Sequence, residues 1–442
     1  DASGNTTNTR CKLVGTYRLT KYLDDDTFNK YAERFDELNI RQPQYTMIEF
    51  DDTVSDDANV SNPDNETGYQ YVPSAHVAAI LRQRHRVLGK QAVKGTMTIA
   101  QLDDADSNKY ADGTAAKLDG TEGDVFVYEP HYWYKGVNDY LRNRKYACFS
   151  SRDEMPDRPE CTVITFEELR DGGSIDSGMK VQTGKADVQS SLTSDSNYSA
   201  VTVSVSGYKR VRFPSVVGSN LVGAVFADDT GTVVKSVIVE TLNARFVDGM
   251  YLISDVPDGA TRLHFSIRNT SDFDCVVLSN SDKIEDMEPD WVEHEACLCG
   301  AFQAVTIGSK LYSAINGATS VASLTQPDMV YYANQRGLQL VDWEMNKDVA
   351  NLFYAKYGRR DAQDQCGYGQ NTNARIIGTT SILGMADTVN PDHKTEWCWY
   401  KTQDEYGSDK YVQIASCNCL GYENWFGNKA EWMDKVSLPN SP

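Results

Sequence analysis

Two C-x-C pairs are the residues whose type and spacing come closest to a metal or redox site. Cys297 and Cys299 lie in "EACLCGAF", and Cys417 and Cys419 lie in "IASCNCLG". Four thiolates could bind zinc, but structural zinc sites usually separate paired cysteines by two to four residues. Spacing of i, i+2 instead puts both thiols on one face of a strand. We predict buried strand cysteines, with zinc binding or a disulfide as the alternatives; the redox state is left open.

Histidines and carboxylates give no catalytic motif. None of the histidines stands in H-E-x-x-H or beside a nucleophile motif. Acidic pairs such as Asp103/Asp104 and Asp228/Asp229 are typical of solvated turns, and the acidic loop "SDDANVSNPDNE" lacks the calcium spacing of an EF-hand. The expectation is therefore no catalytic residue, no metal and no cofactor, and a chain that is not an enzyme. The histidines considered are His76, His85, His131, His264, His294 and His393.

Clustered aromatic residues are the remaining candidates for a binding role. The stretch "GYENWFGNKAEWMD", residues 421–434, holds two tryptophans, a phenylalanine and a tyrosine beside glycines. These rings either line a binding site or fill a core around a sharply turning backbone. Upstream, Trp397, Trp399 and Tyr400 in "WCWY" are the candidate ligand-binding residues.

Composition limits the classes of function. A chain of 442 residues is expected to fold as two or three domains. Its formal net charge of −20 repels phosphate backbones, so no nucleic acid partner is expected. No run of 18 apolar residues is present, so membrane insertion is not expected either. Because the first residue is Asp1, we expect a piece or a processed form of a longer protein.

Hydrophobic periodicity divides the chain into four segments. Residues 1–45 are predicted to be a helical lead-in, because apolar residues recur there at helical spacing. Residues 46–152 mix strands with one helix. "DVFVYEPHYWYK" gives the strongest strand signal, and "PSAHVAAILRQRHRVL" is predicted to be a helix starting at Ser74. Residues 160–288 alternate strictly, with Val201, Val203 and Val205 on one face, and predict an antiparallel β-sandwich. Residues 289–442 again show both helix and strand patterns. We therefore expect residues 46–152 and 289–442 to form one α+β domain that carries the sandwich as an insertion.

Two helices are predicted in the last segment from their end signals. "SLTQPDMVYYANQRG" has Thr325 as the cap, Pro327 in the first turn and Gly337 as the C′ residue that follows the C-cap. "DWEMNKDVANLFYAKYG" carries one apolar stripe, made by Met345, Val349, Leu352 and Phe353, and closes at Gly358. Within the sandwich, hairpin turns are predicted at Asp229-Thr230-Gly231 and Asp258-Gly259.

The segment "GNKAEWMD" resembles the G-N-V-W-E-W signature of the C-type-lectin-like fold, which formylglycine-generating enzymes share with the variable proteins of diversity-generating retroelements. Gly427, Asn428, Glu431 and Trp432 match, whereas Lys429 and Ala430 depart from Val-Trp. Upstream, Trp343 and Glu344 stand where the family has Glu-Trp-Glu. The order "YGRRDAQDQCGYG…GYENWFGNKAEWMD" is similar to tail-fibre proteins of gut phages that present a variable surface. The run "GAVFADDTGTVVKS…MYLISDVPDGATRLHFSIRN" resembles jelly-roll domains of the carbohydrate-binding-module type. Such a domain would either bind a sugar or act as a spacer.

This resemblance implies an adhesion function on a phage tail, in the extracellular virion. The expected partners are a bacterial cell-surface glycan or protein receptor and other phage tail proteins, and the family suggests a homotrimer. Trp425 and Trp432 are then scaffold residues, and the principal ligand face is expected beyond Pro442. Formylglycine-generating enzymes need paired cysteines after the motif, and this sequence has none after Cys419. A bacterial surface or fimbrial adhesin and a structural baseplate or fibre component are the alternatives.

Overall fold

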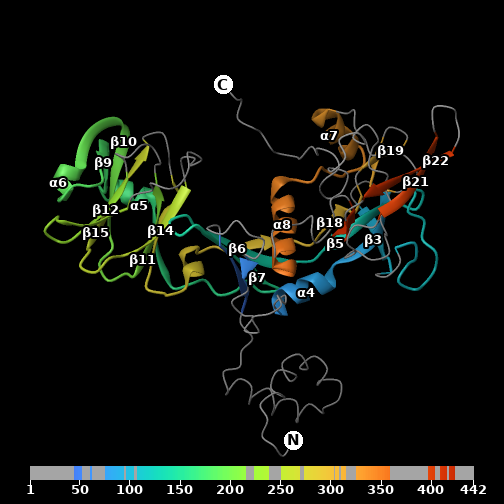
Figure 1. Ribbon diagram of the computed structural model, residues 1–442, viewed down its shortest axis with the longest axis horizontal. Coiled ribbons are helices and arrows are strands. Elements are labelled where there is room, and N and C mark those ends of the chain that lie inside the picture. Colours follow the sequence, from blue (N-terminus) through green and yellow to red (C-terminus); the bar gives the residue numbers. More distant parts are fainter. Residues whose placement is uncertain are drawn as a thin grey trace, which may run out of the picture.

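The computed structural model describes fourteen stretches of the chain, and it is mostly antiparallel β-sheet with few helices (Figure 1). The predicted lead-in up to residue 43 lies outside them. So do five motif residues, Trp425, Gly427, Asn428, Glu431 and Trp432. The described residues are 44–51, 60–61, 75–93, 96–103, 107–215, 223–237, 250–268, 273–302, 304–307, 310–314, 325–358, 397–403, 409–415 and 418–423.

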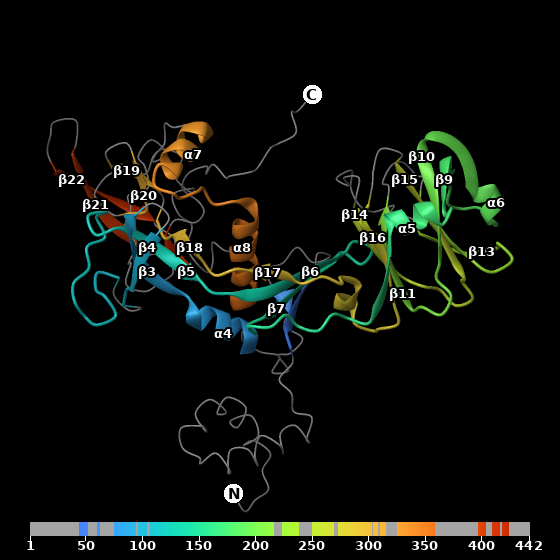
Figure 2. The ribbon, with the colours of Figure 1, turned by 180° about the vertical axis from the view of Figure 1, so that it is seen from behind.

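The described residues form two bodies side by side (Figures 1 and 2). The outer body comprises the described parts of residues 44–152 and 289–423, and the insert comprises those of 160–288. The outer body consists of β1 (Thr46–Asp51), β2 (Val60–Ser61), α4 (Ala75–Gln83), β3 (His85–Val93), β4 (Thr96–Gln101), β5 (Asp124–Glu129), β6 (Tyr132–Asp139), β7 (Arg144–Ser150), β17 (Val292–His294), β18 (Cys297–Gly300), β19 (Val305–Ile307), β20 (Lys310–Tyr312), α7 (Gln326–Asn334), α8 (Trp343–Tyr357), β21 (Trp397–Gln403), β22 (Asp409–Ala415), β23 (Asn418–Cys419) and β24 (Tyr422–Glu423). The insert consists of β8 (Cys161–Thr165), α5 (Phe166–Asp171), β9 (Ile175–Val181), α6 (Val188–Ser191), β10 (Leu192–Ser204), β11 (Arg210–Ser215), β12 (Ala224–Ala227), β13 (Val233–Val237), β14 (Met250–Asp255), β15 (Arg262–Arg268), β16 (Cys275–Ser279) and the 3-10 helix η2 (Ile284–Met287).

Two antiparallel sheets frame the outer body, in the strand orders β17-β6-β7-β1-β2 and β18-β5-β3-β4. The apolar run that reads as one strand, residues 124–135, is divided between them. Pro130 separates β5 from β6, which then pair in different sheets. A proline has no backbone N–H for the ladder, so the strand ends there. The prediction of a single strand is wrong at this point.

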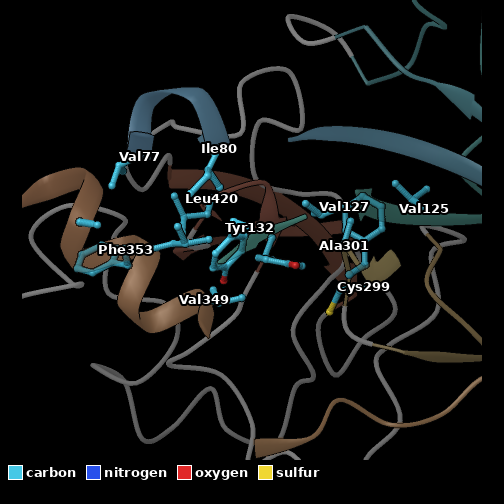
Figure 3. Close-up of a cluster of buried hydrophobic side chains, with 14 of the residues drawn as sticks. Val77, Ile80, Val125, Val127, Tyr132, Cys299, Ala301, Val349, Phe353 and Leu420 are labelled. Carbon is cyan, nitrogen blue, oxygen red and sulfur yellow. The ribbon is translucent and has the colours of Figure 1, made fainter. Parts of the chain in front are cut away.

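The core of the outer body draws on residues from both sides of the insert. Figure 3 shows Val77 and Ile80 of α4 meeting Val349 and Phe353 of α8, with the buried ring of Tyr132 between the helices and the strands. The predicted stripe of α8 is confirmed, because Val349, Leu352 and Phe353 are buried and Met345 packs against them. Segments more than 200 residues apart in sequence therefore share one apolar core.

The predicted start of α7 and the predicted end of α8 are confirmed, whereas the end of α7 differs: Gln335 is its cap, and the left-handed Gly337 follows two residues later. Thr325 and Asp328 form a capping box at the start of α7, and Asp342 caps α8. Gly358 ends α8 in the left-handed conformation, at φ 63°. The helix predicted from Ser74 is shorter than expected: α4 ends at Gln83, and "HRVL" begins β3 because its backbone pairs with β5.

The insert is built from two antiparallel sheets, β13-β12-β15-β10-β9 and β14-β11-β16-β8, packed on one shared core. Val201, Val203 and Val205 all point into it, as their alternation predicts. The Asp229-Thr230-Gly231 turn joins the paired strands β12 and β13. The Asp258-Gly259 turn connects β14 to β15, which belong to different sheets, so the predicted hairpin there is wrong.

A buried histidine makes the stability of the insert dependent on pH. His264 on β15 is hydrogen-bonded through Nδ1 to Thr202 Oγ1 at 2.9 Å, and burial lowers its pKa to about 4. The unfolded chain takes up the proton first, near pH 6.5, so stability is complete above that pH and is lost as pH falls towards 4. Replacing His264 by Gln should remove roughly 2–3 kcal/mol of the difference in unfolding free energy between pH 7 and pH 4.5. Denaturant titrations at the two pH values measure it, and equal pH dependence of the two proteins would contradict it.

Candidate functional site

The candidate ligand-binding residues lie on a two-stranded ribbon, β21–β22. Trp397 pairs with Ala415, Trp399 with Gln413 and Tyr400 with Val412 across it. The structure describes the backbone of these three residues and places all of them on β21. The ribbon lies at the end of the outer body farthest from the insert, beside β19 and near α7 (Figures 1 and 2). The motif residues Trp343 and Glu344 form the first turn of α8.

A tight hairpin directly after the ribbon fastens it to the core. β23 and β24 are joined by Leu420 at φ 52° and Gly421 at φ 89°, two left-handed residues as a type I′ turn requires. Leucine rarely adopts this conformation, and here its side chain is buried in the core, which offsets the strain. Arg86 Nε donates to the carbonyl oxygen of Gly421 at 2.8 Å, so a buried guanidinium holds the turn.

A buried ion pair below this hairpin involves Glu129 at the end of β5. Arg84 Nε donates to Glu129 Oε2 at 2.7 Å, and Arg84 Nη2 donates to Oε1. The hydroxyl of Tyr422 also donates to Oε1, and its burial raises the pKa of Tyr422 well above its usual value. The side chains of Arg84 and Glu129 are only 5% and 1% exposed. The carboxylate therefore connects the strands of the first segment with the hairpin that follows the ribbon.

A second buried ion pair fixes α7 beside β20. Arg336, just past the end of α7, donates from Nη1 to Asp124 Oδ1 at 2.8 Å and to the carbonyl oxygen of Leu311 at 2.8 Å. Its guanidinium carbon lies 3.8 Å from the centre of the Tyr312 ring. Asp124 Oδ1 also accepts from the backbone N–H of Ser313 at 2.9 Å. These contacts hold α7 in place.

The anchored helix presents an aromatic pair at the surface. Tyr331 is 59% exposed, and its ring meets that of Tyr332 edge-on, with centroids 5.5 Å apart. Exposed aromatic rings on a fixed scaffold are common in recognition surfaces. α7 therefore adds surface aromatics at the same end of the outer body as the ribbon (Figure 1).

The two thiols of the C-x-C pair on β18 differ in their exposure to solvent. Cys299 is buried and Cys297 is exposed, and both are free thiols, so the prediction of buried cysteines is confirmed for the first and wrong for the second. The Cys297 side chain is exposed at the strand edge, yet desolvation by the surrounding protein and the nearby carboxylate of Glu129 raise its pKa to about 11. Complete burial raises the pKa of the Cys299 thiol well above its usual value. Among the described residues no group of three potential ligands could hold a metal ion. Cys417 lies outside those residues, and only the backbone of Cys419 is described.

Sequence reasoning did not identify the two buried ion pairs. One signal was present: Asp124 and Glu129 bound the strongly apolar strand "DVFVYE", where a buried carboxylate requires a partner. Within the described stretches, no helix has both the length and the apolar character needed to cross a membrane. Comparisons with protein-family models, with curated proteins and with solved structures found no match to this chain. What the chain does therefore has to be inferred from its own residues.

Proposed function

We propose that this chain is a receptor-binding protein of a phage tail fibre or tail tip, and that its outer body has a C-type-lectin-like fold. It binds a bacterial cell-surface glycan or protein receptor and performs no chemistry on it. The resemblance of Gly427, Asn428, Glu431 and Trp432 to the family signature supports the proposal. The position of Trp343 and Glu344 at the start of a core helix is compatible with it.

The observation that carries the proposal is the anchored aromatic ribbon. β21–β22 holds Trp397, Trp399 and Tyr400 at the end of the molecule away from the insert (Figures 1 and 2). The hairpin that follows is fixed by Arg86 and by the Glu129 ion pair. A fixed base lowers the entropy lost on binding, which is how rigid recognition elements gain affinity. Tryptophan and tyrosine are also the side chains most enriched at binding hot spots.

Several copies are expected to act together. Linked weak sites reach high avidity without new contacts, and the family suggests a homotrimer attached to other tail proteins. The net charge of −20 disfavours nucleic acid as a competing partner.

Replacing Trp399 by Ala should weaken receptor binding by roughly 30-fold, the effect of about 2 kcal/mol at a hot spot. The full chain and the variant are compared for binding to a panel of bacterial strains by flow cytometry, and to their purified surface polysaccharides by biolayer interferometry. Thr402→Ala, on the same strand, is the matched control and should bind as the parent does.

Equal binding by the parent and by Trp399→Ala would show that the ribbon is not the contact surface. Absence of binding to every strain would favour the second candidate, a structural fibre or baseplate component. The separate core of the insert, at the other end of an extended molecule, is the observation that favours this spacer role (Figure 1). If the protein binds its receptor only when it is anchored in a bacterial envelope, the result would instead favour a bacterial surface or fimbrial adhesin.

A further inference from the structure

The sheet β17-β6-β7-β1-β2 is covered on both faces. Tyr132 and Phe149 point into the core of the outer body. On the opposite face, Val137 and Tyr146 are buried against the insert. Since neighbouring residues of a strand point to opposite faces, these two sets cannot belong to one core. The insert thus supplies the second apolar cover of this sheet.

The insert offers a matching apolar face on its sheet β14-β11-β16-β8. Leu252 and Leu278 point into the core of the insert, whereas Ile253 and Val277 point outward and are nevertheless 1% and 0% exposed. They pack with Val137 and Tyr146 and with the buried Met287 of η2 in one cluster. The outward residues are therefore buried by Val137 and Tyr146 of the outer body together with Met287 of the insert.

The turn between β6 and β7 adds a second layer to this contact. Tyr140 and Leu141 at its tip pack against the core of the insert. Arg142 donates from Nη1 to Asp139 Oδ2 at 2.6 Å and from Nη2 to Asp255 of β14. The turn of the outer body therefore inserts apolar side chains into the neighbouring body and closes the contact with ion pairs.

A caged lysine lies where the chain leaves the insert and re-enters the outer body. Lys135 of β6 is 1% exposed, and its Nζ lies 4.7 Å from the ring centre of Trp291 and 5.7 Å from that of Tyr45. The hydroxyl of Tyr45 donates to Glu285 of η2 at 3.0 Å. Cation–π contacts of a desolvated ammonium are among the strongest of their kind. The cage therefore connects β6 of the outer body with η2 of the insert.

We propose that this interface, the joint, holds the insert and the outer body as one rigid unit, with the insert at a fixed orientation. Interfaces between domains allow relative motion unless they are large and apolar, and the joint has a continuous apolar cluster, an inserted turn and a cationic cage. This inference is independent of receptor binding. If the joint is rigid, the distance between the ribbon β21–β22 and the far end of the insert is fixed.

The test replaces Val277 by Lys in the full chain. A lysine there places a charge in the joint without touching the insert's own core, because Val277 faces outward. Hydrogen exchange of the amides at residues 139–144 should rise by about tenfold or more, the equivalent of about 1.4 kcal/mol. Small-angle scattering should show a larger and more variable maximum dimension. Amides of β10 and β15 should keep their protection.

Val163→Lys is the matched control. Val163 lies directly opposite Val277 in the ladder of β8 and β16 and on the same face, but it is 41% exposed. This variant should exchange and scatter as the parent does. Unchanged exchange and scattering in Val277→Lys would overturn the proposal, and so would equal changes in the two variants. Loss of protection in β15 of Val277→Lys would also overturn it, since Val277 would then support the core of the insert itself.

Discussion

Glu129→Ala is expected to lower the unfolding free energy of the outer body by about 3–5 kcal/mol, because it leaves the buried guanidinium of Arg84 without its counter-charge. Glu129 Oε1 and Oε2 accept from both Arg84 nitrogens, and Oε1 also accepts from Tyr422. The loss should also release the hairpin β23–β24, which is the base of the ribbon. Denaturant unfolding of the full chain, followed by tryptophan fluorescence, measures the stability.

Two companion variants separate charge burial from packing. Tyr422→Phe removes only the hydroxyl and should cost about 1.5–3 kcal/mol, as for a hydrogen bond to a charged group. The double variant Arg84→Met/Glu129→Leu removes both charges and should recover most of the stability lost in Glu129→Ala. A double variant as unstable as Glu129→Ala would show that lost packing, and not the unpaired charge, determines the effect.

Asp124→Ala is expected to have an effect of similar size on the other side of the outer body. Arg336 is buried, and without Asp124 it retains only the carbonyl oxygen of Leu311 and the ring of Tyr312 among its described contacts. The cost of an unpaired buried guanidinium is again about 3–5 kcal/mol. Because Arg336 follows α7 directly, amide exchange should increase first in α7, which mass spectrometry resolves by segment.

The matched control for this prediction acts at the other end of the same helix. Thr325→Ala removes the side chain that caps α7 and should cost about 1 kcal/mol. Protection of α7 that survives in Asp124→Ala but is lost in Thr325→Ala would show that the cap, and not the ion pair, holds this helix.

The sequence alone was sufficient to predict those features that depend on a few neighbouring residues. Thr325, Asp328 and Gly358 determine the helix ends from one turn of chain, and the alternation of Val201, Val203 and Val205 determines a strand face. These patterns work because capping and amphipathic burial depend on spacing alone. The sequence also shows which aromatics are close neighbours along the chain, such as Trp397 and Trp399.

Only the tertiary structure decided which distant groups meet. The sequence leaves the partner of Glu129 open, yet Arg84 lies 45 residues before it and Tyr422 lies 293 residues after it. Asp124 and Arg336 are 212 residues apart. The pairing follows from how the sheets and helices pack, because a buried charge has to be neutralised by whatever group the fold brings within reach. For the same reason, the two sheets that Pro130 separates and the burial of Val277 against the outer body could not be read from periodicity. The alternation of residues in a strand predicts which face is apolar, but only the tertiary structure shows which element covers that face.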